Sequence, residues 1–119
     1  MTATADPAAE PLSPVFQALG HPTRRAVVER LGAGAATVTE LAAPFDMALP
    51  SFLQHVRLLE ASGVVATEKR GRVRTVRLVP SALLAASEWL ARQRAVWDAR
   101  IDRLDAFLQR PESDSKDPR

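Results

Sequence analysis

The hydrophobic pattern of this 119-residue chain changes its period at Gly63. Before Gly63, apolar residues recur at the three- and four-residue spacing of α-helices, and over residues 64–78 they alternate with polar residues as in β-strands. From residue 80 to about residue 108 the helical spacing returns. The pattern therefore predicts a mainly α fold with one small β-hairpin and a long terminal helix.

The first two helices are expected to be short. Ser13 suits the N-cap of the first helix and Gly20 suits its stop, with Val15, Phe16 and Leu19 between them. Residues 21–23 then begin a second helix, whose apolar positions end before a Gly-Ala-Gly run at residues 32–34.

The next two helices lie close together in the sequence. Thr37 and Glu40 have the spacing of a capping box at the start of a third, short helix, which Pro44 limits. Pro50 suits the first position of a fourth helix, because that position needs no amide hydrogen, and Gly63 ends this helix. Two short helices with a tight connection and a hairpin directly after them predict a winged helix-turn-helix.

The chain should form one domain with simple termini. We expect residues 1–12 and 110–119 to be disordered, residues 13–80 to form the winged helix-turn-helix, and residues 81–109 to form the terminal helix. That helix would extend about 42 Å, at about 1.5 Å per residue, which exceeds a compact domain of this size. Part of it therefore needs a partner.

Several classes of chemistry are not expected. The chain has no Cys, and so no disulfide, thiolate metal site or thiol nucleophile. Its two histidines, His21 and His55, lie in separate segments, and neither a Gly-rich phosphate loop nor a nucleophile elbow is present. The sequence therefore predicts a protein that is not an enzyme and needs no cofactor. Without a long apolar run or a signal-peptide pattern, we expect no membrane contact and a cytoplasmic location.

Positive charge is concentrated in one short stretch. The net charge is only +2, but residues 14–79 hold nine basic against five acidic residues, and residues 68–77 hold five basic residues and one acid. Such a local concentration attracts an anionic polymer.

Three segments carry a resemblance to a known family. FQALGHPTRRAVVERL (residues 16–31), VTELA (38–42) and PSFLQHVRLLEASGVV (50–65) resemble bacterial repressors of the ArsR/SmtB type, and the similarity extends through the basic hairpin. The resemblance implies a dimeric, operator-binding transcriptional regulator, usually a repressor and often released by a small effector. A winged helix that serves only as a protein-interaction module or transcription-complex subunit is the alternative.

The fourth helix is expected to be the recognition helix. At ~100° per residue, Phe52, Val56 and Leu59 form a buried seam. Pro50, Gln54 and Arg57 cluster on the opposite, polar side, which would face DNA. Ser51 and Gln54 suit base edges, and Arg57 suits a phosphate or a guanine. The predicted contact residues are Pro50, Ser51, Leu53, Gln54, His55 and Arg57.

Two of these positions have competing interpretations. Leu53 stands where the family often has a small hydroxyl residue, so it could meet a thymine methyl group or pack on a neighbouring element. His55 borders the buried face, and a role as a partly buried helix residue, satisfied by a backbone group or a phosphate, competes with a ligand role.

The hairpin tip is predicted to form the wing contacts through Lys69, Arg70, Arg72 and Arg74. The alternative is a charged strand pair that serves only solubility. Arg24 and Arg25 stay unassigned between a phosphate contact, an exposed position and an ion pair with Glu29.

The terminal helix carries two apolar stripes, more than one side of a helix needs, which favours a homodimer over internal packing or a tryptophan-lined pocket. A two-fold dimer would place its recognition helices about 34 Å apart on a pseudo-palindromic operator. The residues predicted at the dimer interface are Phe16, Leu19, Trp89, Leu90, Trp97, Ile101, Leu104 and Leu108.

The sequence gives less information about a possible effector than about DNA binding. Some members of the family sense metals through Cys, His and carboxylate ligands, but the last helix here has no His, and its carboxylates alternate with arginines. We therefore expect no metal site. Binding of a small organic effector near Trp89 and Trp97 is an alternative that the sequence does not decide.

Overall fold

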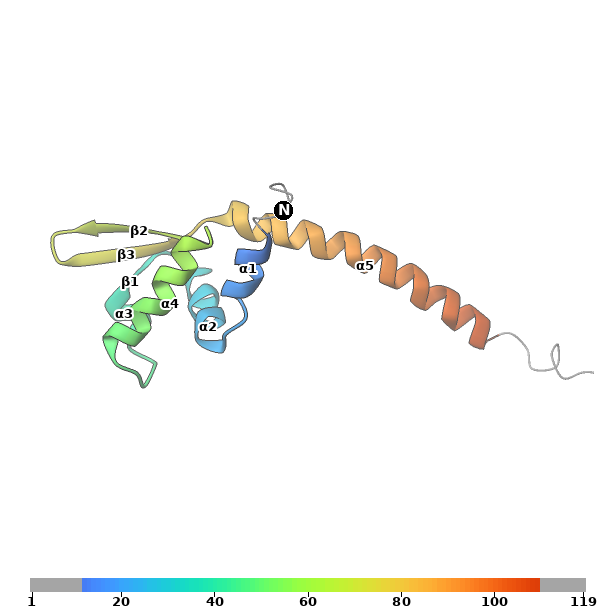
Figure 1. Cartoon of the computed structure of the whole chain (residues 1–119), viewed down its shortest axis with the longest axis horizontal. Helices are drawn as coiled ribbons and strands as arrows, with labels where there is room; N and C mark the ends of the chain where they lie inside the picture. The colour runs from blue at the N-terminus through green and yellow to red at the C-terminus, as the bar shows by residue number, and fades with distance from the viewer. Residues whose placement is uncertain (1–11, 110–119) are drawn as a thin grey trace, which may run out of the picture. The chain divides into compact units, whose positions relative to one another are not determined.

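The computed structural model describes residues 12–109. The predicted tails lie almost entirely outside this range, except that Leu12 already belongs to the first helix. In chain order the elements are α1 (Leu12–Ala18), α2 (Pro22–Leu31), β1 (Ala36–Thr37), α3 (Val38–Ala42), α4 (Leu49–Ala61), β2 (Val65–Arg70), β3 (Val73–Leu78) and α5 (Pro80–Leu108), as Figure 1 shows.

The helix starts agree with the predictions except at two positions. The capping box is present, with the Thr37 side chain accepting from the Glu40 amide and Glu40 accepting from the Thr37 amide. Ser13 lies inside α1 rather than at its cap, because the helix already includes Leu12. Pro50 follows Leu49, the first residue of α4, and is still tolerated in a first turn that needs few amide donors.

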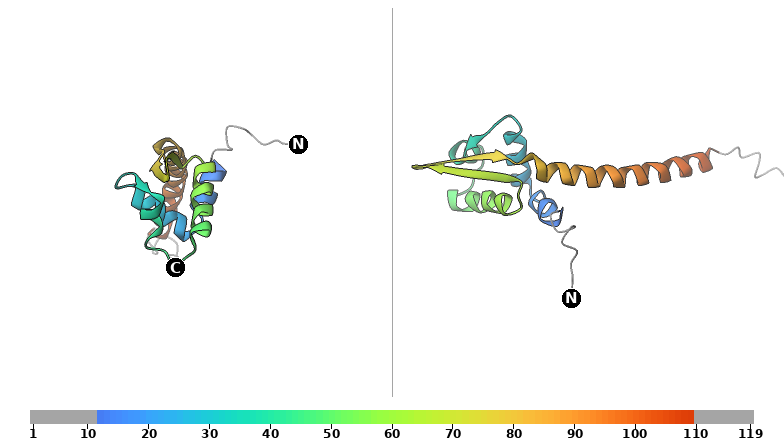
Figure 2. Two further views of the ribbon diagram at one scale, coloured as in Figure 1. Left: turned by 90° about the vertical axis from the view of Figure 1, so that its left-hand side faces the viewer. Right: turned by 90° about the horizontal axis from the view of Figure 1, so that it is seen from above.

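The hairpin forms part of a three-stranded antiparallel sheet in the order β1-β3-β2. Strands β2 and β3 pair from Val65 with Leu78 to Arg70 with Val73, so that Gly71 and Arg72 form a two-residue turn (Figure 2). Gly71 has a φ of +61°, a conformation that glycine adopts without steric cost. Strand β1 was not predicted, since two residues are too few to show an alternating pattern.

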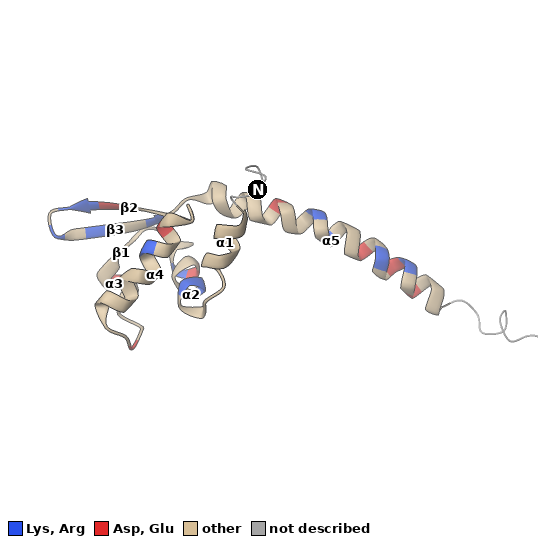
Figure 3. Ribbon diagram, in the orientation of Figure 1, with Lys and Arg blue, Asp and Glu red and all other residues tan. Residues whose placement is uncertain are grey.

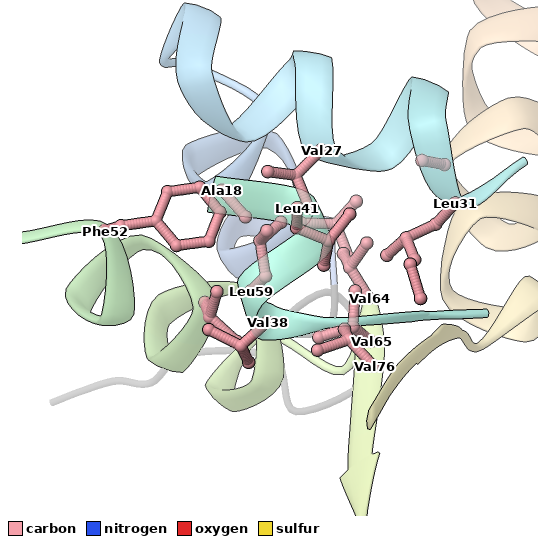
Figure 4. Packing of buried hydrophobic residues seen from close by; sticks show 14 residues of the cluster. Ala18, Val27, Leu31, Val38, Leu41, Phe52, Leu59, Val64, Val65 and Val76 are labelled. Carbon is pink, nitrogen blue, oxygen red and sulfur yellow. The ribbon is translucent and has the colours of Figure 1, made fainter. Parts of the chain in front are cut away.

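The core lies between the short helices and the sheet (Figure 4). Phe52, Val56 and Leu59 of α4 are all buried, as predicted, and Phe52 is packed beside Phe45 with 5.5 Å between ring centroids. Val76 of β3 and Val27 of α2 complete the same cluster. The described chain is therefore a winged helix-turn-helix, with α3 and α4 as its two central helices and β2–β3 as its wing.

Helix α5 belongs to two compact units, the first ending at Ala86 and the second beginning at Ser87. Ala82, Leu83 and the buried Ala86 pack against the core, so the first unit extends about two helical turns beyond the boundary expected at residue 80. From Ser87 to Gln109, no side chain is buried. Within residues 12–109, none of the helices has the length and apolar character needed to span a membrane.

Candidate nucleic-acid interface

One face of α4 is polar and exposed. Pro50, Ser51, Gln54 and Arg57 are exposed, on the side of the helix that does not carry its buried seam. Leu53 is half-buried and packs at the edge of the core. The helix therefore offers hydrogen-bonding groups and a cation to a partner while its other side anchors it to the domain.

His55 faces Arg24 of α2 and His21. Its Nδ1 lies 3.1 Å from Arg24 Nη1, and its ring centroid lies 4.5 Å from that of His21. A guanidinium only donates hydrogen bonds, so His55 Nδ1 accepts and the imidazole is neutral. Burial, with the neighbouring His21 and Arg24 charges, lowers the pKa of His55 from 6.5. The partner of His55 is thus an arginine side chain rather than a backbone group.

Arg24 and Arg25 serve the end of α1. Arg24 donates from Nε to Ala18 O at 2.7 Å and from Nη2 to Gln17 O at 3.2 Å, while Arg25 donates from Nη1 to Leu19 O at 2.8 Å. These carbonyls accept from side chains because the last C=O groups of a helix have no donors within the helix. The sequence analysis left the roles of these two arginines undecided. The end of the short helix before them, whose carbonyls need donors, was the signal that could have indicated their roles.

Most cations of the wing lie toward its outer end (Figure 3). Lys69, Arg70 and Arg72 are exposed, and Arg70 Nη2 lies 3.1 Å from Glu68 Oε2. An exposed pair of this kind contributes little to stability, but it offsets the charge of Arg70. Lys69 and Arg72, in contrast, are exposed cations of the wing tip for which the described chain shows no acidic partner.

Arg74 has a different environment. It is half-buried, and its Nη1 donates to Thr67 Oγ1 at 3.0 Å, while Thr67 Oγ1 donates to Glu60 Oε2 at 2.9 Å. This relay joins both wing strands to the end of α4. It was not predicted, because Thr67 and Glu60 lie seven residues apart in elements of different type.

A groove of about 380 Å³ separates the wing from the helix-turn-helix. Its lining contains three cations, two threonines and four apolar side chains but no acid. The lining residues are Thr37, Val38, Thr39, Leu49, Leu53, Lys69, Arg72, Val73 and Arg74. The sequence analysis did not identify Leu49 or Val73 as site residues. Each of these side chains is about half exposed, at 51% and 50%.

The predicted dimer residues fall into two groups. Phe16 and Leu19 are partly buried and pack against the core of the first unit. In the second unit Trp89 is half-buried, while the other five are more than half exposed: Leu90, Trp97, Ile101, Leu104 and Leu108. Arg100 lies over the Trp97 ring at 5.5 Å from its centroid.

Comparison with known proteins agrees with this architecture. The helix-turn-helix domain family matches residues 19–68. The crystal structure of the ArsR family transcriptional regulator RHA00566 is 52% identical and superposes with a TM-score of 0.72, covering 80% of this chain and 97% of that one. The chain belongs to the ArsR family of transcriptional regulators.

Two further matches are to named transcriptional regulators. The HTH-type transcriptional regulator Rv2034 of Mycobacterium tuberculosis is 39% identical over 70 residues, which is 59% of this chain and 65% of that protein. The transcriptional repressor SdpR of Bacillus subtilis is 28% identical over 76 residues, 64% of this chain and 84% of that protein. The matched segment thus spans just under two thirds of Rv2034.

Proposed function

We propose that this ArsR-family protein is a cytoplasmic, homodimeric repressor that binds a pseudo-palindromic duplex operator. The observation that carries the proposal is the combination of an exposed polar face on α4 with an arginine-tipped wing in one compact unit. Phosphate contacts supply most of the affinity for DNA, and groups at base edges supply sequence preference.

Most of the predicted contacts have a role in this proposal. Gln54 and Ser51 read base edges, Arg57 binds a phosphate or guanine, and Lys69, Arg70 and Arg72 meet phosphates beside the wing. His55, held by Arg24, positions α4 against α2. Phe16, Leu19 and the apolar stripe of α5 supply the dimer contacts.

Selection from a random duplex pool tests the proposal. We expect the protein to enrich a two-fold symmetric site with half-site centres about 34 Å apart, and its affinity to fall steeply with salt. No enrichment, together with indifference to DNA at low salt, would contradict DNA binding and favour a protein partner. Enrichment of an asymmetric single site would contradict the dimer.

A further inference from the structure

The groove between the wing and α4 has a cationic part and an apolar part. A charged face that serves only solubility would not need the apolar part. Lys69, Arg72 and Arg74 provide cations, and none of the nine lining residues is acidic. Leu53 and Val73 provide apolar surface beside them, together with Leu49. Leu49 and Leu53 are four residues apart and therefore share one edge of α4.

The relay through Thr67 ties the wing to α4 beside this groove. Because Arg74 Nη1 binds Thr67 and Thr67 binds Glu60, β3 is tied to α4 through two hydrogen bonds. A guanidinium has five N–H donors, so the bond to Thr67 leaves Arg74 with capacity for a phosphate oxygen. The groove therefore has a cationic rim, and one of its cations, Arg74, is held in place by the relay.

We propose that this groove receives one strand of the bound duplex and that Leu53 recognises the methyl group of a thymine in it. The inference rests on the proposed function. One sugar-phosphate backbone separates the major groove of a duplex from the adjacent minor groove, so a helix in the first and a wing in the second leave that strand between them. The cationic rim binds its phosphates.

Thymine is the base that fits the apolar part of the groove. It alone carries a methyl group at the major-groove edge, and a leucine side chain has no hydrogen-bonding group with which to distinguish the other bases. Leu53 therefore adds sequence preference at one position, next to the base read by Gln54. Leu49 and Val73 extend the apolar contact on either side of it.

The test replaces each thymine of the selected duplex, one at a time, by deoxyuridine, which lacks only the methyl group. We expect one position in each half-site at which this change weakens binding about fourfold per half-site, the effect of one buried methyl group of about 0.8 kcal/mol. In Leu53→Ala the thymine and deoxyuridine duplexes should bind equally at that position. Gln54→Ala, a change at an exposed position of the same helix, should keep the fourfold ratio.

Measuring a ratio of affinities on one protein preparation removes the effect of any loss of folded protein. Because Leu53 also packs against the core, Val73→Ala provides a second variant at an exposed position of the wing, and it should lower the ratio too. Equal binding of every deoxyuridine duplex by the unmodified protein, or an unchanged ratio in Leu53→Ala, overturns the inference while DNA binding stands. Failure to enrich any duplex overturns the proposed function itself.

Discussion

At the scale of single residues, His55 shows how α4 is held by a neutral histidine beside an arginine. The His55 imidazole accepts from Arg24, and Arg24 also binds the carbonyls that end α1. A proton on His55 Nδ1 would face the guanidinium and remove the acceptor. Acid should therefore weaken the contact between α4 and the first two helices.

The pH dependence follows from the direction of the His55 shift. Its pKa is lowered from 6.5 in the folded protein, so the unfolded chain binds more protons in this range. The contribution of His55 to the free energy of unfolding is complete above pH 6.5 and is lost as pH falls through the lower folded pKa. Urea unfolding from pH 7.5 to 5 should show a smaller pH slope in His55→Gln, whereas parallel curves for the two proteins would contradict the assignment.

Arg72 and Arg70 allow a matched comparison in the wing. Arg72→Ala should remove one phosphate contact per subunit and lower the slope of log K against log salt by about 0.9 per subunit. Arg70→Ala should lower it less, because Glu68 already offsets this charge. Binding of random duplexes from 50 to 200 mM salt measures both slopes, and equal slopes in Arg72→Ala and the unmodified protein would remove the wing turn from the interface.

At the scale of elements, short helices and strands depend on a few local bonds. Helix α3 has five residues, too few to be stable alone, and its capping box satisfies amides at its start. The wing is a two-stranded extension whose position depends on its contacts with α4 and β1.

The cap of α3 gives a stability prediction. Thr37→Ala should lower the free energy of unfolding by about 1 kcal/mol, the usual cost of losing an N-cap hydroxyl. Thr39→Ala, an exposed change in the same helix, is the matched control and should stay within about 0.5 kcal/mol of the unmodified protein. Chemical unfolding monitored by circular dichroism compares the two variants. Equal losses of unfolding free energy would contradict a stabilising role for the Thr37 capping bond.

The relay through Thr67 predicts a loosened wing. Thr67→Val keeps the shape of the side chain but removes the hydroxyl that joins Glu60 to Arg74. Amide hydrogen exchange in β2 and β3 should accelerate, and DNA affinity should fall. Thr75→Val, on the neighbouring strand, should change neither. Unaltered exchange in Thr67→Val would show that strand pairing alone positions the wing.

At the scale of the whole molecule, the apolar stripe on α5 bears on assembly. Trp97, Ile101 and Leu104 are each 56% exposed in the single chain, which is a large apolar area to leave in water. A second copy of the chain would cover it and would bring two recognition helices to one duplex.

Ile101→Glu should convert the dimer to a monomer, because it places an unpaired charge in an apolar contact. Arg92→Glu introduces the same residue on the opposite face of α5, by helical spacing, and should leave the dimer intact. Sedimentation equilibrium at micromolar concentration distinguishes the two masses. A dimer that persists in Ile101→Glu would exclude this stripe as the interface.

Local patterns in the sequence determined most of the secondary structure and the two faces of α4. Helical periodicity, the capping box of Thr37 and Glu40, and the turn at Gly71 act between residues that are near neighbours in the chain, so the sequence alone was sufficient to predict them. The same is true of the positive wing, since its charges are contiguous.

Only the tertiary structure decided how these elements are joined. The contact between Arg24 and His55 spans 31 residues, the relay from Glu60 to Arg74 crosses three elements, and strand β1 forms only because β3 offers it an edge. The groove likewise draws its lining from β1, α3, α4 and the wing. Such partners are chosen by packing at long range, which no local spacing specifies.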